Sequence, residues 1–268
     1  MKSKASLLLW GSGFVVLNLY ANLIPKLFQL DVLPWLAYAF GFFMVAFLLG
    51  RYVLRLQGLA SFGLQRHIGW GSNLAIGFIL GFSIWALKNV AYYAMGKFEV
   101  TGMMDTSYIG VLLGQALMGM FLASAINDLM IRGYWFAFCK RENFMKWYLL
   151  IATVLYALDD SWNEGFDLMN LVFSAILGLS LAYTVLKTGS IWMTIGIHWG
   201  GNVLYRMMSG FNGQGIWKVE SVAEGVQYEY VSLLVTALLF PVVYFMLRDS
   251  KQASEEAGWQ EESTPQPE

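Results

Sequence analysis

The sequence predicts an all-α protein that crosses a membrane several times, and three observations lead to this fold class. Apolar residues make up 57% of the 268-residue chain, so an ordinary soluble core cannot absorb them all. Charged residues make up 13%, about half the share that is usual in soluble domains. The apolar residues also gather into long runs, and a helix needs about 20 such residues to cross a hydrocarbon layer of about 30 Å. We therefore expect a polytopic helical bundle.

Eight apolar runs follow one another along the chain, so we expect about eight transmembrane helices in a single domain at 1–247. The runs lie at 7–28, 33–55, 72–95, 108–139, 147–160, 168–187, 189–207 and 229–247. The fourth run is too long for one straight crossing and is expected to be tilted or broken. The fifth run is short and ends on two acids. The glycine-rich loop at 208–228 is expected to be irregular and extracellular.

The distribution of cations predicts the orientation, because cytoplasmic loops carry an excess of Lys and Arg. With a cytoplasmic N-terminus, the inner side holds Lys2, Lys4, Arg51, Arg55, Arg66, Lys140, Arg141, Lys146, Lys187, Arg248 and Lys251. The outer side then holds only Lys26, Lys97, Arg206 and Lys218. We expect an integral protein of a bacterial plasma membrane with both termini in the cytoplasm. The segment 248–268, rich in Glu, Ser, Gln and Pro, is predicted to be a disordered acidic cytoplasmic tail.

Several classes of function are disfavoured by composition and motif content. The net charge of −1 and the scattered cations provide no basic surface for nucleic acid. Cys139 is the single cysteine, which excludes an internal disulfide and a thiolate metal cage. The chain has neither an HExxH zinc motif nor a GxSxG nucleophile motif. The expected partners are the lipid bilayer and a membrane protein or peptide, as substrate or binding partner.

Three polar islands interrupt the apolar runs. They consist of Asn127, Asp128 and Arg132; of Asp159 and Asp160; and of His198 and Asn202. Ionisable groups are costly at membrane depth and usually mark function there. At 1.5 Å per helical residue, the three islands lie roughly 14 to 20 Å from the inner ends of their runs. All three are thus near the middle of the bilayer, and three different spans can share one polar chamber.

Spacing within the first and third islands allows two interpretations of each. Asp128 and Arg132 are four residues apart on one helix face, where they can form a purely structural ion pair. His198 and Asn202 have the same spacing and are either hydrogen-bonded core residues or part of a site. The glycines at 196, 200 and 201 permit close approach of another helix or of a substrate backbone.

The second island closes a short helix, and its two acids point about 100° apart around the helix axis. We expect Asp159 to be solvated at the helix end and Asp160 to face the chamber.

The run from Asn127 to Tyr134 resembles the EExxxRG motif of the CPBP family, the CAAX-protease and bacteriocin-processing membrane proteins also called Abi proteins. The run from Tyr156 to Asp160 falls where this family has FxxxH, and His198 to Asn202 is similar to its HxxxN motif. Residues 186–192 are similar to the family's approach to that third motif. The resemblance covers about 110–205, and it implies a CAAX-protease-like helical bundle with a core at about 108–207.

The resemblance implies an intramembrane endopeptidase in which a first-motif glutamate and a second-motif histidine activate water. The third-motif histidine and asparagine, here His198 and Asn202, would steady the oxyanion. Two central positions differ, because Asn127 stands at the glutamate position and Asp160 at the second histidine position. An amide cannot accept the proton that a general base must take. Asp128 retains a carboxylate, which in this pattern holds Arg132.

Three hypotheses for the function remain open. In the first, the chain is a membrane endopeptidase with a substituted site: Asp160 is the base, Asn127 positions water, and His198 with Asn202 stabilises charge. In the second, it is a catalytically inactive family member that binds or regulates another membrane protein as a scaffold. In the third, it is an ion-coupled transporter with Asp160 and Lys88 as a relay, although Lys88 can also reach the interface through its long side chain.

The sequence implies no cofactor firmly. Asp128, Asp160 and His198 could hold a divalent ion only weakly, since they include one nitrogen ligand and no thiolate.

Overall fold

A computed structural model describes residues 4–28 and 31–249 of the chain, so most of the predicted tail lies outside the described residues. The α-helices are α1 (Lys4–Leu27), α2 (Val32–Leu48), α3 (Trp70–Ala94), α4 (Thr106–Asp128), α5 (Tyr134–Arg141), α6 (Tyr148–Glu164), α7 (Leu168–Thr188), α8 (Trp192–Ser209), α9 (Val226–Ala237) and α10 (Leu239–Leu247). The short helices are the π segments η1 (Leu49–Val53) and η3 (Leu129–Gly133) and the 3-10 turns η2 (Gly58–Phe62) and η4 (Met145–Trp147). The all-α prediction is confirmed.

Every apolar run predicted from the sequence contains a helix, but the helices differ in how apolar they are. Within the described residues, six helical segments are long and apolar enough to cross a membrane. These are 4–27, 32–53, 70–94, 106–141, 168–188 and 226–247. The other two runs correspond to α6 and α8, which carry the second and third polar islands. Helix α6 is one of the shorter helices, with 17 residues, whereas α8 has 18 residues and contains His198 and Asn202.

The over-long fourth run is one continuous helical segment that contains a π turn. The segment extends over 106–141, and η3 interrupts its α-helical geometry between α4 and α5. A π turn holds an extra residue, so it rotates the side chains that follow, and such turns are frequent at functional sites. Arg132 lies within η3. The predicted break is therefore a local change of helical pitch beside the first polar island.

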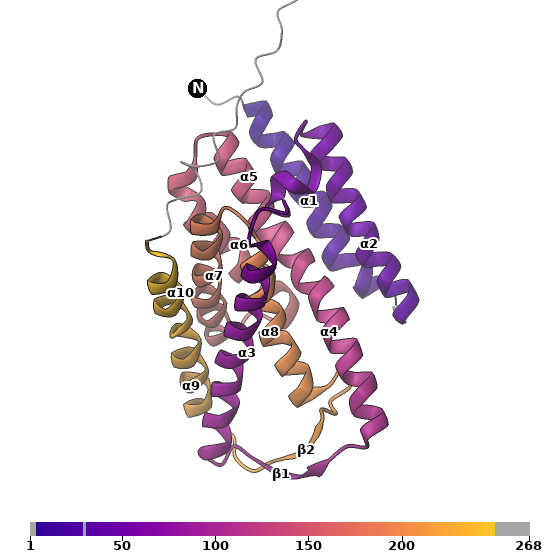
Figure 1. Cartoon of the computed structure of the whole chain (residues 1–268), viewed down its shortest axis with the longest axis vertical. Coiled ribbons are helices and arrows are strands. Elements are labelled where there is room, and N and C mark those ends of the chain that lie inside the picture. Colours follow the sequence, from indigo (N-terminus) through magenta and orange to yellow (C-terminus); the bar gives the residue numbers. More distant parts are fainter. Residues whose placement is uncertain (1–3, 29–30, 250–268) are drawn as a thin grey trace, which may run out of the picture.

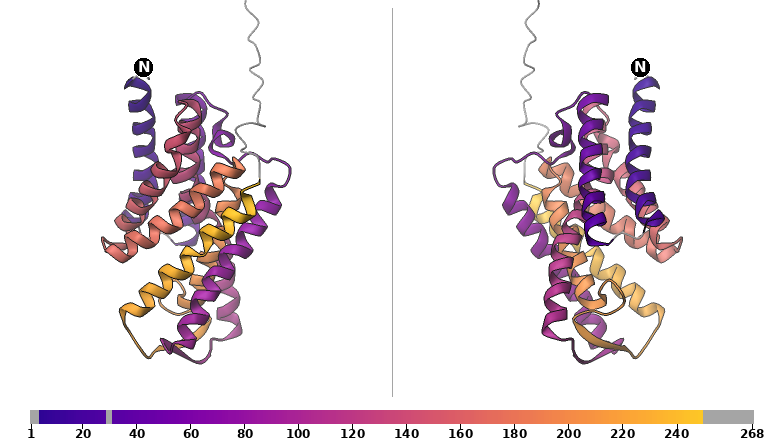
Figure 2. Two further views of the ribbon diagram at one scale, coloured as in Figure 1. Left: turned by 90° about the vertical axis from the view of Figure 1, so that its left-hand side faces the viewer. Right: turned by 90° about the vertical axis from the view of Figure 1, so that its right-hand side faces the viewer.

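The helices form a bundle with α8 near its centre (Figures 1 and 2). Figure 1 shows α1 and α2 side by side along one flank, and α7, α9 and α10 along the other. The helix pair α3 and α8 is the most extensively packed in the bundle. The three polar islands are thus carried by helices that lie between the two flanks.

The close packing of α3 and α8 depends on glycine. A Cβ atom at Gly77 or Gly81 of α3 would overlap the backbone of α8, and one at Gly196 or Gly200 would overlap the backbone of α3. Both pairs have the spacing of small residues that lets membrane helices approach closely. The predicted close approach at Gly196 and Gly200 is thus made by another helix. The arrangement fixes the position of α8 and of the third island that it carries.

One end of the bundle carries a two-stranded antiparallel sheet. Its strands are β1 (Phe98–Met103) and β2 (Trp217–Ser221), and they pair Phe98 with Ser221 and Met103 with Trp217. The prediction of an irregular loop at 208–228 is therefore wrong for 217–221, which form a strand, whereas 210–216 and 222–225 are irregular. Neither strand could be recognised from its own segment, because each pairs with a partner more than a hundred residues away. The sheet closes the end of the bundle opposite the start of α1 (Figure 1).

Candidate functional site

The first and third islands meet in a group that we call the charged cluster, formed by Asp128, Arg132 and His198. Arg132 Nη1 donates to Asp128 Oδ1 over 2.5 Å, and both side chains are fully buried. His198 Nδ1 lies 3.5 Å from Asp128 Oδ2. Asp128 therefore stands between a guanidinium from its own helical segment and an imidazole from α8.

Aromatic rings enclose the charged cluster. The Arg132 guanidinium lies 4.4 Å from the centroid of the Tyr156 ring, at a distance that allows a cation–π contact. The same Tyr156 ring meets the His198 ring edge to face, with 6.0 Å between the centroids. Tyr148, also on α6, donates its hydroxyl to the Arg132 carbonyl over 3.5 Å. Helix α6 thus supplies apolar cover for charges that α4, η3 and α8 bring together.

Asn202 contacts a different partner from His198, one helical turn away. Its Nδ2 donates to Ser124 Oγ on α4 over 3.3 Å. The two third-motif residues therefore join α8 to the fourth helical segment at two levels: His198 faces Asp128, and Asn202 faces Ser124.

Asp159 is the centre of a second group, which we call the amide cluster: Asn18, Asn22, Asn127, Asp159 and Asn163. Its Oδ2 accepts from Asn127 Nδ2 over 3.2 Å. Its Oδ1 accepts from Asn18 Nδ2 over 3.1 Å and from Asn22 Nδ2 over 2.9 Å. Asn163 Nδ2 donates to Asn22 Oδ1 and to the Asp159 carbonyl, each over 2.9 Å. Three amides from two other helices thus hold this carboxylate.

The expectation of a solvated Asp159 is therefore wrong. Asp159 is only 9% exposed, because α1 packs against this face of α6 and brings amide donors to it. Asp160 lies on another face of α6, and its Oδ2 accepts from Ser174 Oγ on α7. Of the two acids, Asp159 is the one that contacts the first island.

Sequence reasoning missed Asn18, Asn22 and Asn163. A signal existed in α1, where Asn18 and Asn22 are four residues apart in an apolar run. That is the same spacing as His198 and Asn202, and it places both amides on one helix face. A polar pair within an N-terminal apolar run can be overlooked as part of a membrane anchor.

A cavity of about 200 Å³ reaches the amide cluster. Asn22, Asn127, Asp159 and Asn163 form its polar part. The remaining lining comes from apolar and aromatic side chains, which are Ala21, Pro25, Trp35, Tyr38, Ala123, Ile126 and Met130. The cavity therefore joins a polar end at Asn127 to an aromatic wall on α2.

Four buried polar atoms of the charged cluster have no hydrogen-bond partner among the described residues. They are Asp128 Oδ2, Arg132 Nε, Arg132 Nη2 and His198 Nδ1. Most buried polar groups in proteins are hydrogen-bonded, and leaving one unpaired costs about 1–3 kcal/mol. Two of these atoms, Asp128 Oδ2 and His198 Nδ1, face each other over 3.5 Å, so the unused hydrogen-bonding capacity of the charged cluster lies mainly on the Arg132 guanidinium.

Neither the weak metal site nor the relay of the transporter hypothesis gains a contact from the structure. In the described parts of the chain, no three His, Cys, Asp or Glu side chains are grouped closely enough to hold a metal ion. Lys88 Nζ lies 5.1 Å from the Trp85 ring centroid and 5.7 Å from that of Phe173. Among the described residues, Lys88 thus makes cation–π contacts and forms no ion pair with Asp160.

The charged cluster places a buried carboxylate, a guanidinium and an imidazole together inside a bundle of apolar helices. A family model described as Rce1-like, type II CAAX prenyl endopeptidase Rce1-like, matches residues 109–204. This segment contains all three islands and is similar to the CPBP family of CAAX-protease-like membrane proteins. Together with the six long apolar helical segments in the described residues, the match supports an integral membrane protein of protease-like type. Helices α1, α2, α3, α9 and α10 lie outside the matched segment. Comparisons with curated proteins and with solved structures gave no match.

Proposed function

We propose that this protein binds a membrane-embedded peptide segment of another protein at the charged cluster and does not hydrolyse it. The observation that carries the proposal is a contrast between two adjacent residues. Asp128 belongs to a cluster with unpaired buried donors and acceptors, whereas Asn127, at the position of the water-activating glutamate, is an amide that donates to Asp159.

The capacity to bind a peptide rests on the unpaired atoms of the charged cluster. A peptide backbone offers one donor and one acceptor per residue, and inside a membrane each of them needs a partner. Arg132 Nε and Nη2 can donate to a carbonyl oxygen, and Asp128 Oδ2 can accept from an amide hydrogen. The cluster therefore matches the hydrogen-bonding needs of an unwound transmembrane segment.

The absence of hydrolysis rests on what surrounds Asn127. A general base must lie within hydrogen-bond reach of the proton that it takes. Asn127 cannot take a proton, and the neighbouring Asp159 accepts from three amides, which uses three of the roughly four acceptor positions of a carboxylate. Asp160, the base of the substituted-site hypothesis, accepts instead from Ser174.

The decisive experiment restores the family pattern and looks for a gain of activity. The variant carries Asn127→Glu, Asp159→Asn and Asp160→His. Asp159→Asn is included because a glutamate at 127 would otherwise face the Asp159 carboxylate. Proteoliposomes that contain wild type or the variant are incubated with prenylated CAAX peptides and with unprenylated transmembrane peptides. We expect no cleavage by wild type and cleavage by the variant.

The matched control carries Gln at 127 together with Asp159→Asn and Asp160→His, and we expect it to be inactive. Binding is measured with peptides that carry a photo-reactive residue, and the yield of adduct with the protein should fall in His198→Ala. Cleavage by wild type that is lost in His198→Ala would refute the proposal.

A second candidate, a membrane endopeptidase, is favoured by the 3.5 Å contact between His198 Nδ1 and Asp128 Oδ2. A carboxylate beside an imidazole orients it and stabilises its protonated form, as in other sites where histidine is the base. In this candidate His198 takes the water proton and Asp128 orients it. Wild-type cleavage that falls about a hundredfold or more in Asp128→Asn and His198→Ala, yet persists in Asp160→Asn, would support it.

A further inference from the structure

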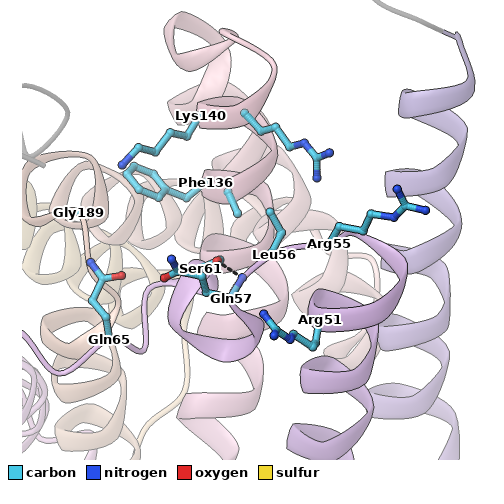
Figure 3. A pocket seen from close by; sticks show the side chains of 11 residues that line it. Arg51, Arg55, Leu56, Gln57, Ser61, Gln65, Phe136, Lys140 and Gly189 are labelled. Atoms are coloured by element: carbon cyan, nitrogen blue, oxygen red, sulfur yellow. Dashed lines mark hydrogen bonds between the residues drawn. The ribbon is translucent and has the colours of Figure 1, made fainter. Parts of the chain in front are cut away.

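A second cavity, of about 420 Å³, lies at the end of the bundle where α1 begins and is separate from both clusters. Its lining comes from the segment that links α2 to α3, from the end of α5, and from the turn between α7 and α8. The lining residues are Arg51, Arg55, Leu56, Gln57, Ser61, Gln65, Phe136, Ala137, Lys140, Arg141 and Gly189. Figure 3 shows Lys140 and Phe136 on one side and Arg51 on another, with Gln57 and Ser61 between them.

The charge of this cavity is unbalanced. Four cationic side chains line it, and none of the acidic side chains in the described part of the chain does. Within the described residues, no ion pair joins Arg51, Arg55 or Arg141 to a carboxylate. Like charges held near one another repel, so the arrangement favours an anionic ligand. Gln57, Ser61 and Gln65 add polar groups of the kind that orient a phosphate oxygen.

The segment between α2 and α3 is held by hydrogen bonds to α5 and α8 and by one hydrogen bond of its own. Arg141 Nη1 donates to the Leu54 carbonyl, and Ser61 Oγ accepts from the Gln57 backbone amide over 3.0 Å. Trp192 Nε1, at the start of α8, donates to the Gln65 carbonyl over 3.0 Å. These bonds fix Arg141 and the backbone that carries Gln57, Ser61 and Gln65 before any ligand arrives, which lowers the entropic cost of binding.

The segment between α2 and α3 is also tightly packed against the core beneath it. Ser190 Oγ donates to the Gly63 carbonyl over 3.1 Å, and the Ile191 amide donates to the same oxygen over 3.1 Å. Phe62 is fully buried beneath the segment, and a Cβ at Gly133 would overlap its carbonyl oxygen. The segment is therefore part of the folded core, although it is a connection between two spans.

The surroundings of the cavity favour a lipid over a soluble anion. Leu56, Phe136 and Ala137 give the cavity an apolar wall. Tyr52 and Val53, next to Arg51, are 69% and 48% exposed on the outer surface of the bundle, where acyl chains would lie. Basic pockets between membrane helices at the headgroup level bind anionic lipid headgroups. We propose that this cavity binds the phosphate of an anionic phospholipid, with its acyl chains along the end of α2.

The test measures lipid retained by the purified full-length protein in detergent. Dioleoyl phosphatidylglycerol or dioleoyl phosphatidylcholine is added, and bound lipid is counted by native mass spectrometry. We expect the anionic lipid to be retained in preference. The double variant Arg51→Gln/Arg55→Gln should lower its affinity on the order of tenfold. Both arginines are exposed, and the single variant Arg51→Gln gives a second measurement if the double variant fails to fold.

The matched control is Arg66→Gln/Arg248→Gln, which removes two exposed arginines that do not line the cavity. It should leave retention unchanged, whereas an equal loss would mean that general basicity, not the cavity, attracts the lipid. A third arm adds inorganic phosphate at millimolar concentration. Displacement of the lipid by phosphate would identify a soluble anion as the ligand and overturn the lipid assignment, as would equal retention of the two lipids.

Discussion

The charged cluster and the amide cluster start from neighbouring residues on one helix and have opposite properties. Asp128 leads into the charged cluster, which lies entirely within the matched segment and leaves four buried polar atoms unpaired. Asn127 leads into the amide cluster, where Asp159 accepts from three amides and two of these come from α1, outside the matched segment. One cluster leaves hydrogen-bonding capacity unused among the described residues, and the other uses its capacity to join helices.

A change of one functional group, from a carboxylate to an amide at position 127, can turn a catalytic position into a structural one. A carboxylate at position 127 would face another carboxylate at Asp159, which is unfavourable in a buried place. An amide there can donate, and Asn127 Nδ2 does so over 3.2 Å while its Oδ1 accepts from Arg132 Nη1 over 3.3 Å. Asn127 thus connects the two clusters, and its amide is suited to structure and not to proton transfer.

The largest effect is expected from breaking the buried ion pair of the charged cluster. Arg132→Met removes the guanidinium that neutralises the buried Asp128 carboxylate and leaves only His198 beside it, and this should cost about 3–5 kcal/mol. Unfolding of the purified protein in mixed micelles measures the loss. The double variant Asp128→Leu/Arg132→Met should recover most of it, because no charge is then left buried alone. A double variant as unstable as the single one would contradict the explanation.

The next largest loss of stability is expected from disturbing the packing of α8 against α3, which positions His198. Gly200→Leu forces α8 away from α3, and overpacking of this kind costs about 1–3 kcal/mol. The control is Gly114→Leu in α4, where a Cβ would meet nothing within 4 Å. Thermal unfolding in detergent should show a large decrease for the first variant and little change for the second. Similar decreases would show that the glycine contacts do not set the helix distance.

The amide cluster is predicted to contribute through α1. Asn22→Ala removes a donor to the Asp159 carboxylate and an acceptor for Asn163, with an expected loss of about 1–2 kcal/mol. The matched control is Asn89→Ala, since the Asn89 amide donates only within its own helix, to the Trp85 carbonyl. The two are compared by unfolding in mixed micelles. An equal effect of both changes would mean that Asp159 does not depend on α1.

The smallest loss of stability is expected from a change at Asp160, the acid that the sequence predicted to face the chamber. Asp160→Asn can still accept from Ser174, so stability should change by less than about 1 kcal/mol. Asp159→Asn should cost more, because a neutral oxygen accepts the Asn18 and Asn22 amides more weakly and its own amide group faces Asn127. The ratio of the two effects, from unfolding under identical conditions, ranks the acids. A larger effect at Asp160 would reverse our assignment.

Much of the fold could be predicted from the sequence because hydropathy is a local property. Each of the eight apolar runs became helix, and the two least apolar ones, α6 and α8, were those with polar islands. The pairing of Asp128 with Arg132 also followed from local spacing, since residues four apart share a helix face. The strands β1 and β2 escaped prediction, because each is stabilised by a partner distant in sequence.

The membrane bundle and the three polar islands could be predicted from the sequence, because they depend on residue type and short-range spacing. The same holds for the amide of Asn127 at the position of a carboxylate. Only the tertiary structure decided which acid meets the first island. Around α6, Asp159 and Asp160 differ by about 100°, and the helix that packs against each face selects its partners. Helix α1 brought amides to Asp159, and α7 brought Ser174 to Asp160. Such long-range packing has no counterpart in a local pattern.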